Sequence, residues 1–347
     1  MIPSSRSIIP LWKVLLTILF LGVLVAALLP GLRQSRGLLP SLAHCRWEWI
    51  GAAALFQVGV YATIGGIFGV SIGALGKSLR PSTLLFVAMA FLFTTKAFAV
   101  AGLATLVLLL KRRGVAADIA QAAAGTFYLA DYAGFIVLSL VVYFCGGTLG
   151  QSAHGLVLSF GLLIGTVVLI IAALRAPKVV TRIVDYVALG GARLLRRGDP
   201  HHTAAKARSV TESFYHRWNE LARRRRAIAL TSVLALAMHI CETGTVACCA
   251  RAFDAPVSAG AAAAAYVAGN LAALVSFLPG GVGFFEGAMA ATLEHLGREP
   301  LTACFAGTLA YRVLALWLPL PIVLLLVREL KGKASPSTKI EGEEAGA

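Results

Sequence analysis

The chain has 347 residues, of which 58% are hydrophobic and 14% are charged. Soluble domains carry about 25% charged residues, so this composition excludes an ordinary soluble protein and a disordered chain, and six cysteines are too few for a disulfide scaffold. Lys and Arg total 31 against 16 Asp and Glu, a formal net charge of +15, so the location of the excess charge decides between a nucleic acid and a membrane as its partner.

Apolar runs between charged residues give the predicted elements. A bilayer core about 30 Å thick needs roughly 20 apolar residues per helix. The sequence therefore predicts an all-α fold, a polytopic membrane helix bundle with about eight hydrophobic segments, the first of which is retained because it lacks a small-residue cleavage site. The segments are Leu11–Leu29, Trp49–Gly76, Pro81–Leu110, Ile119–Cys145, Gly155–Leu174, Ala227–Ala250, Ala255–Phe285 and Leu301–Val327.

The polar stretch 175–226 holds 13 basic and four acidic residues. A basic loop between membrane helices is typical of the cytoplasmic side, and its scattered apolar residues predict short helices on the membrane surface, against anionic lipid headgroups. Nucleic acid is rejected as a partner because the stretch has no recognisable motif. The chain thus divides into an N-terminal membrane half (1–174), this loop, a C-terminal membrane half (227–330) and a polar tail (331–347).

This orientation constrains the topology. With the loop inside, Lys111–Arg113 also lie inside, and so does the polar tail. The segments Pro81–Leu110 and Ala255–Leu296 must then each enter and leave the membrane on one side, or cross it as broken helices. Three basic residues would face outward, against the positive-inside rule: Arg33, Arg36 and Arg46.

The two membrane halves share a spacing of 181 to 183 positions between similar features. Such an offset predicts an inverted repeat whose discontinuous helices meet near the membrane midplane, although Gly- and Ala-rich apolar stretches also match by chance. The equivalent positions are Gly114 with Gly297, Gly125 with Gly307, and Asp131 with Arg312.

The run Pro279-Gly280-Gly281-Val282-Gly283 is the sharpest local signal. Proline and three glycines break a helix, and the freed backbone groups need protein or water partners at membrane depth. Glu286 follows at the start of the next short helix, where the helix dipole favours a carboxylate. The run therefore predicts a cavity or a tightly packed interior, with a loop at the membrane surface as the alternative.

Four ionisable residues stand inside apolar runs: Lys96, Asp131, Glu242 and Arg312. Each costs about 2.5–3.5 kcal/mol at a helix centre, so they are expected to face the bundle interior and to pair. The repeat favours Lys96 with Asp131 and Glu286 with Arg312, while Glu242 is an alternative to either acid. Purely structural ion pairs are as good an explanation as a substrate path.

Other candidate chemistry is weaker. His239 and Glu242 stand three positions apart, but no second motif of this kind completes a metal site, so we predict no metal and no cofactor. Asn270, in the run before the glycine break, is expected to bond across helices or to line a substrate path. No pair of nucleophile and base is recognisable, and we expect that the protein is not an enzyme.

The run from Ala268 to Glu286, followed by Leu296-Gly297 and Tyr311-Arg312, resembles the lysylphosphatidylglycerol synthase transmembrane (flippase-like) family, including its members associated with hopanoid biosynthesis. The resemblance implies a multi-pass protein of the bacterial inner membrane that translocates or presents lipids. It also implies a set of functional positions in the second half of the chain. Lys96 is not among them, because the family's first-half Pro-Gly pattern is missing here, and its role is inferred only from its place inside an apolar run. The implied positions are Gly280, Gly281, Gly283, Glu286 and Arg312.

We therefore predict a lipid flippase-like or lipid-transport protein that moves a polar or anionic lipid, of the aminoacyl-phospholipid, glycolipid or hopanoid class. Its substrate path would include Pro279 in addition to the residues named above. No aminoacyl-lipid synthesis is expected, because the membrane part uses nearly the whole chain. The alternative is a non-transporting membrane protein that holds a lipid-biosynthetic enzyme through the basic loop.

Overall fold

The structure is a computed structural model that describes residues 45–97, 99–146, 168–195, 200–276 and 278–317, with the single positions 161, 164, 165 and 319. The predicted first segment, half of the fifth, the C-terminal part of the eighth and the polar tail lie outside the described residues. The same holds for Arg33 and Arg36.

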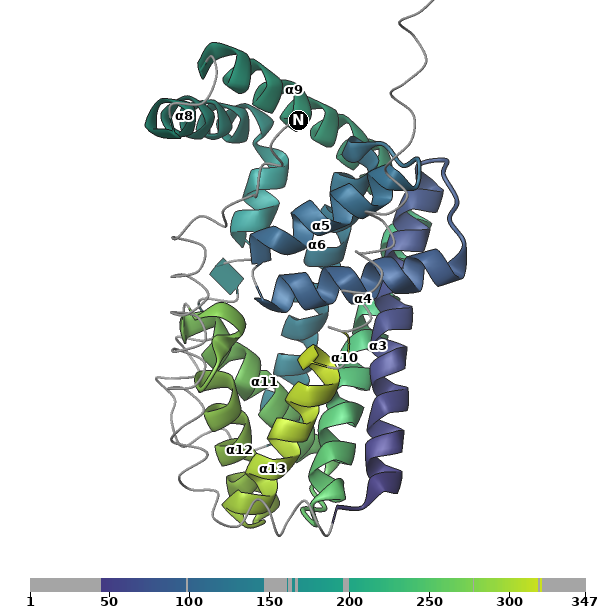
Figure 1. The fold of residues 1–347 in the computed structure, drawn as a ribbon, viewed down its shortest axis with the longest axis vertical. Coiled ribbons are helices and arrows are strands. Elements are labelled where there is room, and N and C mark those ends of the chain that lie inside the picture. The colour runs from purple at the N-terminus through teal and green to yellow at the C-terminus, as the bar shows by residue number, and fades with distance from the viewer. Residues whose placement is uncertain are drawn as a thin grey trace, which may run out of the picture.

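The described part of the chain is helical, which confirms the predicted all-α class (Figure 1). Four of its helices, α3, α6, α10 and α11, are long and apolar enough to cross a membrane. The helices are α3 (Trp47–Ala74), α4 (Pro81–Ala97), α5 (Ala99–Arg112), α6 (Ala117–Gly146), α8 (Pro177–Leu195), α9 (Pro200–Ala222), α10 (Arg225–Ala252), α11 (Ala259–Ser276), α12 (Phe284–Gly297) and α13 (Leu301–Arg312), with short turns at Pro279–Gly281 and Val313–Trp317.

Helices α3 and α10 form an antiparallel pair that runs along one side of the bundle (Figure 1). The backbone N–H of Arg46 donates to the carbonyl of Ala252 at 2.9 Å, so the start of α3 meets the end of α10. Above this point Phe68 of α3 packs against Phe91 of α4, with ring centroids 5.1 Å apart, and Phe127 of α6 completes the aromatic cluster. Such edge-to-face contacts add to the burial of these rings.

The predicted segment Pro81–Leu110 forms a helical hairpin. α4 ends at Ala97, and α5 returns along it to Arg112. Both the turn before α4 and the turn after α5 lie toward the end of the bundle that carries α8 and α9 (Figure 1). The segment is therefore a hairpin rather than one continuous helix, and its two ends lie on the same side of the bundle.

A second hairpin lies at the opposite end of the bundle. The predicted segment Ala255–Leu296 is interrupted at the expected glycine break, because α11 ends at Ser276 and the chain reverses before α12 begins at Phe284. α12 packs along α11, and both ends of this hairpin face away from α8 and α9 (Figure 1). The proline and the glycines of the connecting run cannot continue α11, which explains the position of the break.

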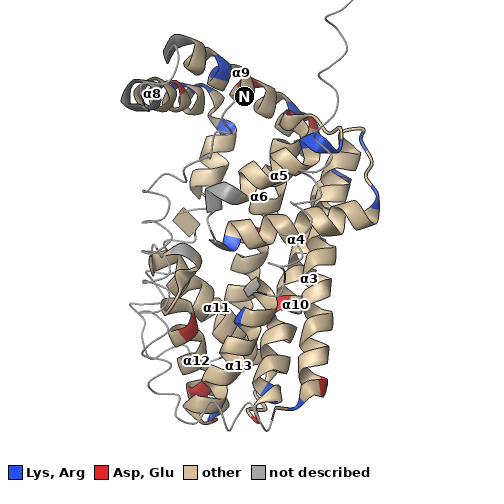
Figure 2. Ribbon diagram, viewed as in Figure 1, with Lys and Arg blue, Asp and Glu red and all other residues tan. Residues whose placement is uncertain are grey.

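Most Lys and Arg residues of the described chain lie at the end of the bundle with α8 and α9, among a few acidic residues, and the opposite end also carries both signs (Figure 2). The 19 residues of α8 and the 23 of α9 make longer helices than predicted for the basic loop. Arg46, at the opposite end, lies 2.7 Å from Asp254, so its charge is compensated locally.

Candidate functional site

A cavity of about 500 Å³ lies where the two hairpins meet. Its size is typical of small-molecule sites. A Cβ added to Gly280 would lie 3.3 Å from the carbonyl oxygen of Lys96, so the end of α4 and the glycine run are in contact. Helices α6, α10, α11 and α13 complete the wall, and its charged and strongly polar members are Lys96, Asp131, His239, Glu242, Asn270 and Arg312.

Glu286 and Arg312 form the predicted ion pair. Arg312 Nε lies 2.5 Å from Glu286 Oε1, and the side chains are 8% and 7% exposed for Arg312 and Glu286 respectively. The guanidinium also lies 4.0 Å from the centroid of the Phe285 ring, a cation–π contact. A pair this deeply buried is compensated only when its remaining hydrogen-bonding groups have partners.

The remaining hydrogen-bonding groups of the Glu286–Arg312 ion pair find partners at the two ends of the glycine run. Arg312 Nη2 donates to the carbonyl of Gly280 at 2.6 Å, and the N–H of Gly283 donates to Glu286 Oε2 at 2.6 Å. Gly280, Gly281 and Gly283 have φ of +68°, +63° and +86°, a region that glycine adopts without strain. The ion pair therefore clamps the run in a fixed shape, and Glu286 and Arg312 act as positioning residues for it.

Lys96 pairs with Glu242, the alternative partner in the sequence analysis, and its predicted pairing with Asp131 is wrong. The distance from Lys96 Nζ to Glu242 Oε1 is 3.2 Å, and Tyr311 donates its hydroxyl to Glu242 Oε2 at 2.8 Å. Lys96 also lies 5.6 Å from the centroid of the Tyr311 ring. From the end of α4 the Lys96 side chain thus reaches Glu242 of α10 and Tyr311 of α13.

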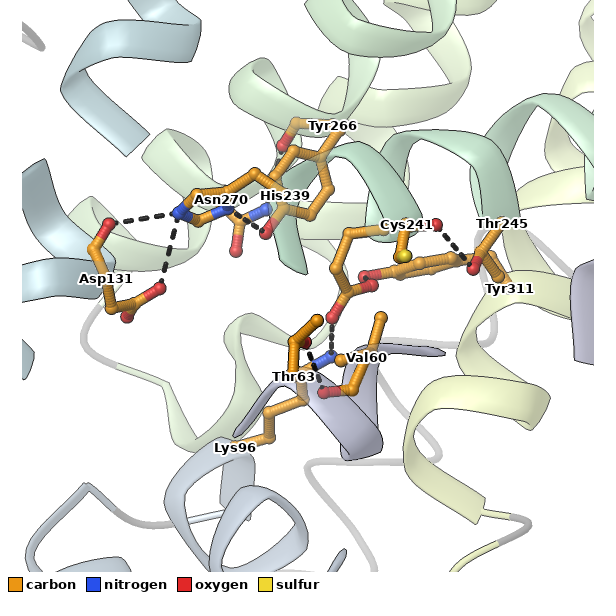
Figure 3. Close-up of polar contacts among 11 residues, drawn as sticks. Val60, Thr63, Lys96, Asp131, His239, Cys241, Thr245, Tyr266, Asn270 and Tyr311 are labelled. Atoms are coloured by element: carbon orange, nitrogen blue, oxygen red, sulfur yellow. Dashed lines mark hydrogen bonds and ion pairs between the residues drawn. The ribbon is translucent and has the colours of Figure 1, made fainter. Parts of the chain in front are cut away.

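Asp131 is instead beside His239 (Figure 3). His239 Nε2 lies 3.0 Å from the carbonyl oxygen of Asp131 and 3.4 Å from its carboxylate, and Nδ1 lies 3.2 Å from the hydroxyl of Tyr266. A neutral imidazole with its proton on Nε2 satisfies both nitrogens, donating to Asp131 and accepting from Tyr266. The Asp131 side chain is 29% exposed, so its carboxylate is the acid most open to the cavity.

The other predicted site residues lie in or beside the same place. Asn270 lines the cavity, but its amide donates to the carbonyl of Tyr266 one turn earlier in α11, at 2.8 Å, so this bond does not cross helices. Pro279 begins the short turn of the glycine run. Gly280 and Gly281 line the cavity, while Gly283 is the N-cap of α12.

His239 was considered in the sequence only as a metal ligand. Its side chain faces Asp131 and Tyr266, whereas Glu242 on the next turn faces Lys96 and Tyr311. The signal that would have placed His239 in the cavity is its spacing of three from Glu242, because residues three apart share a helix face.

The Tyr311→Phe substitution is expected to lower the free energy of unfolding by about 1.5–3 kcal/mol, the range for hydrogen bonds to charged groups. Glu242 is buried and accepts from Tyr311, while the stacking of the Tyr311 ring on Phe285 is kept. Helicity during titration with sodium dodecyl sulfate in mixed micelles measures the change. A double-mutant cycle with Glu242→Met, which removes the acceptor, isolates the bond, and additive effects of the two substitutions would contradict it.

Residues 14–322 of the chain match the family described as the lysylphosphatidylglycerol synthase TM region. The matched range includes both helical hairpins and every residue that lines the cavity. No curated protein matches the chain.

Proposed function

Because the chain belongs to the lysylphosphatidylglycerol synthase TM region family, we propose that it is a flippase-like lipid-transport protein of the bacterial inner membrane. The family and the apolar helices make it a multi-pass membrane protein. Its proposed substrate is a lipid with a polar or anionic headgroup, of the aminoacyl-phospholipid, glycolipid or hopanoid class. Catalysis is not part of the proposal.

The observation that carries the proposal is the gathering of charged side chains around one cavity between the hairpin ends. Lys96, Asp131, Glu242 and Arg312 come from four different helices and all line it. Charges at membrane depth are costly, so they face bundle interiors or water-filled paths. A headgroup that enters this cavity meets charged and aromatic groups instead of hydrocarbon.

The charged side chains of the cavity determine which headgroups it would favour. Both permanent cations already have carboxylate partners, Lys96 with Glu242 and Arg312 with Glu286. An anionic headgroup therefore has to displace Glu242 from Lys96. A headgroup that also carries hydroxyl or ammonium donors finds an acceptor in the partly exposed carboxylate of Asp131, and such a lipid is the first to test.

The arrangement of the hairpins supports an alternating path. α4 and α5 are followed by α6 with Asp131, and α11 and α12 are followed by α13 with Arg312. The two hairpins begin and end at opposite ends of the bundle (Figure 1). We propose that the halves form an inverted repeat, in which one hairpin moves against the other around the cavity.

Headgroup translocation in proteoliposomes tests the function. We expect the wild type to move at least one lipid class, with anionic, zwitterionic, aminoacylated and sugar-bearing lipids assayed separately. Asp131→Asn is expected to slow transport at least tenfold while folding is kept, because the side chain is partly exposed and no Lys or Arg among the described residues pairs with it. Ser213→Ala, at an exposed position of α9, is the matched control.

Two outcomes would contradict the function. Wild-type protein that is inert toward all four lipid classes would rule out transport on its own. Full activity of Asp131→Asn would show that the lipid does not pass through the cavity. A third outcome favours the alternative, in which the protein is a membrane partner of a lipid-biosynthetic enzyme. In that case neutralising Arg223–Arg226 abolishes the cellular function, and Glu286→Gln has no effect.

A further inference from the structure

α8 exposes a continuous apolar face. Val179, Ile183, Tyr186 and Val187 are 54%, 55%, 77% and 68% exposed. Their spacing of four, three and one places them on one side of the helix. Isolated exposed apolar residues are ordinary, but a row of four large ones on a single helix is typical of a surface that contacts another apolar phase.

The other side of α8 already has a partner. Asp185 accepts from Arg208 of α9, with Nη2 2.5 Å from Oδ2. α9 in turn is attached to the bundle, because Arg217 donates to Asp118 of α6 at 2.8 Å and Tyr215 donates to the carbonyl of Ala173 at 2.5 Å. The hairpin of α8 and α9 is thus held in place, and no other described element covers the apolar face of α8.

Position and charge indicate what covers this face. α8 begins at Pro177, directly after helical residues 168–175 with exposed apolar side chains, and it runs across the long axis of the bundle (Figure 1). Lys178 and Arg182 are exposed on the same helix, and basic residues gather at this end of the molecule (Figure 2). An apolar face with basic residues around it is the pattern of a helix that lies in the membrane interface.

We propose that α8 docks its apolar face into the boundary between headgroups and acyl chains of the adjacent leaflet, and that anionic lipid is its specific partner. Lys178 and Arg182 then lie at the level of the lipid phosphates, where the negative surface potential attracts them. This docking is independent of the transport proposed for the cavity. Through Arg217 and Asp118, it anchors the beginning of α6, the helix that carries Asp131.

A fluorophore in full-length protein tests the docking. Ile183→Cys is labelled with a polarity-sensitive dye, reconstituted into nanodiscs of phosphatidylcholine with or without phosphatidylglycerol, and corrected for labelling of the unsubstituted protein. We expect a blue shift of the emission and quenching by nitroxide-bearing lipid, both larger with phosphatidylglycerol. The same dye on Ser213→Cys, exposed on α9, is expected to report water in both nanodiscs.

A double variant tests how much the basic residues of α8 contribute to its docking on anionic lipid. Lys178→Gln combined with Arg182→Gln is expected to abolish the difference between anionic and neutral nanodiscs, and added salt is expected to do the same in the wild type. If the dye at position 183 is as exposed to water as the dye at position 213, the docking is overturned, and a protein partner becomes the occupant of the apolar face. Equal burial in both nanodiscs would overturn the preference for anionic lipid.

Discussion

Arg312→Gln is expected to lower the free energy of unfolding by about 3–5 kcal/mol, the cost of breaking a buried ion pair by removing one partner. Glu286, whose side chain is 7% exposed, would lose the cation that compensates it. The carbonyl of Gly280 would also lose its donor. We expect transport to be lost together with stability, because the glycine run that lines the cavity loses its clamp.

Two further variants separate charge from geometry. Arg312→Lys keeps the positive charge but not the planar fork that reaches Glu286 and Gly280 together, so an intermediate loss is expected. Glu286→Gln combined with Arg312→Met removes both charges and keeps an acceptor for the N–H of Gly283, so most of the stability is expected to return. Detergent titration followed by circular dichroism measures all three, and wild-type stability of Arg312→Gln would refute the clamp.

The positions of the charged residues were predictable because each stands alone in an apolar run. A lone charge in such a run has to face the interior, so Lys96, Glu242 and Arg312 were expected to converge before any pairing was known. The break at Pro279–Gly283 was also predictable, because those residue types cannot continue a helix. Local chemistry was sufficient for these features.

The pairing of Lys96 was not predictable, because it depends on a reversal that the local sequence does not mark. Between α4 and α5 the chain reads Thr95-Lys96-Ala97-Phe98-Ala99, with no proline or glycine at the break. Packing of α5 along α4, rather than local propensity, sets this turn. The reversal brings the end of α4 to Glu242, and no spacing in the sequence contains that information.

Gly281→Ala is expected to lower the free energy of unfolding by about 2–5 kcal/mol, from two contributions. The backbone φ of +63° costs an alanine about 1–2 kcal/mol, and overpacking a closed interior costs about 1–3 kcal/mol more. The overpacking arises because the new Cβ would overlap the Cβ of Ala273 on α11 and lie 2.7 Å from its Cα. α11 and the glycine run would have to separate, which distorts the cavity wall.

Gly287→Ala, six residues further along on α12, is the matched control. A Cβ there meets no atom of the described residues within 4 Å, and alanine stabilises a helix by about 0.5–1 kcal/mol relative to glycine, so stability should rise slightly and the proposed transport should stay unchanged. Adding Ala273→Gly to Gly281→Ala removes the overlap of the two Cβ atoms but neither the contact with Cα nor the cost of φ, so recovery should be partial. Complete recovery would show that overlap with one methyl group, and not the shape of the glycine run, excludes a side chain at position 281.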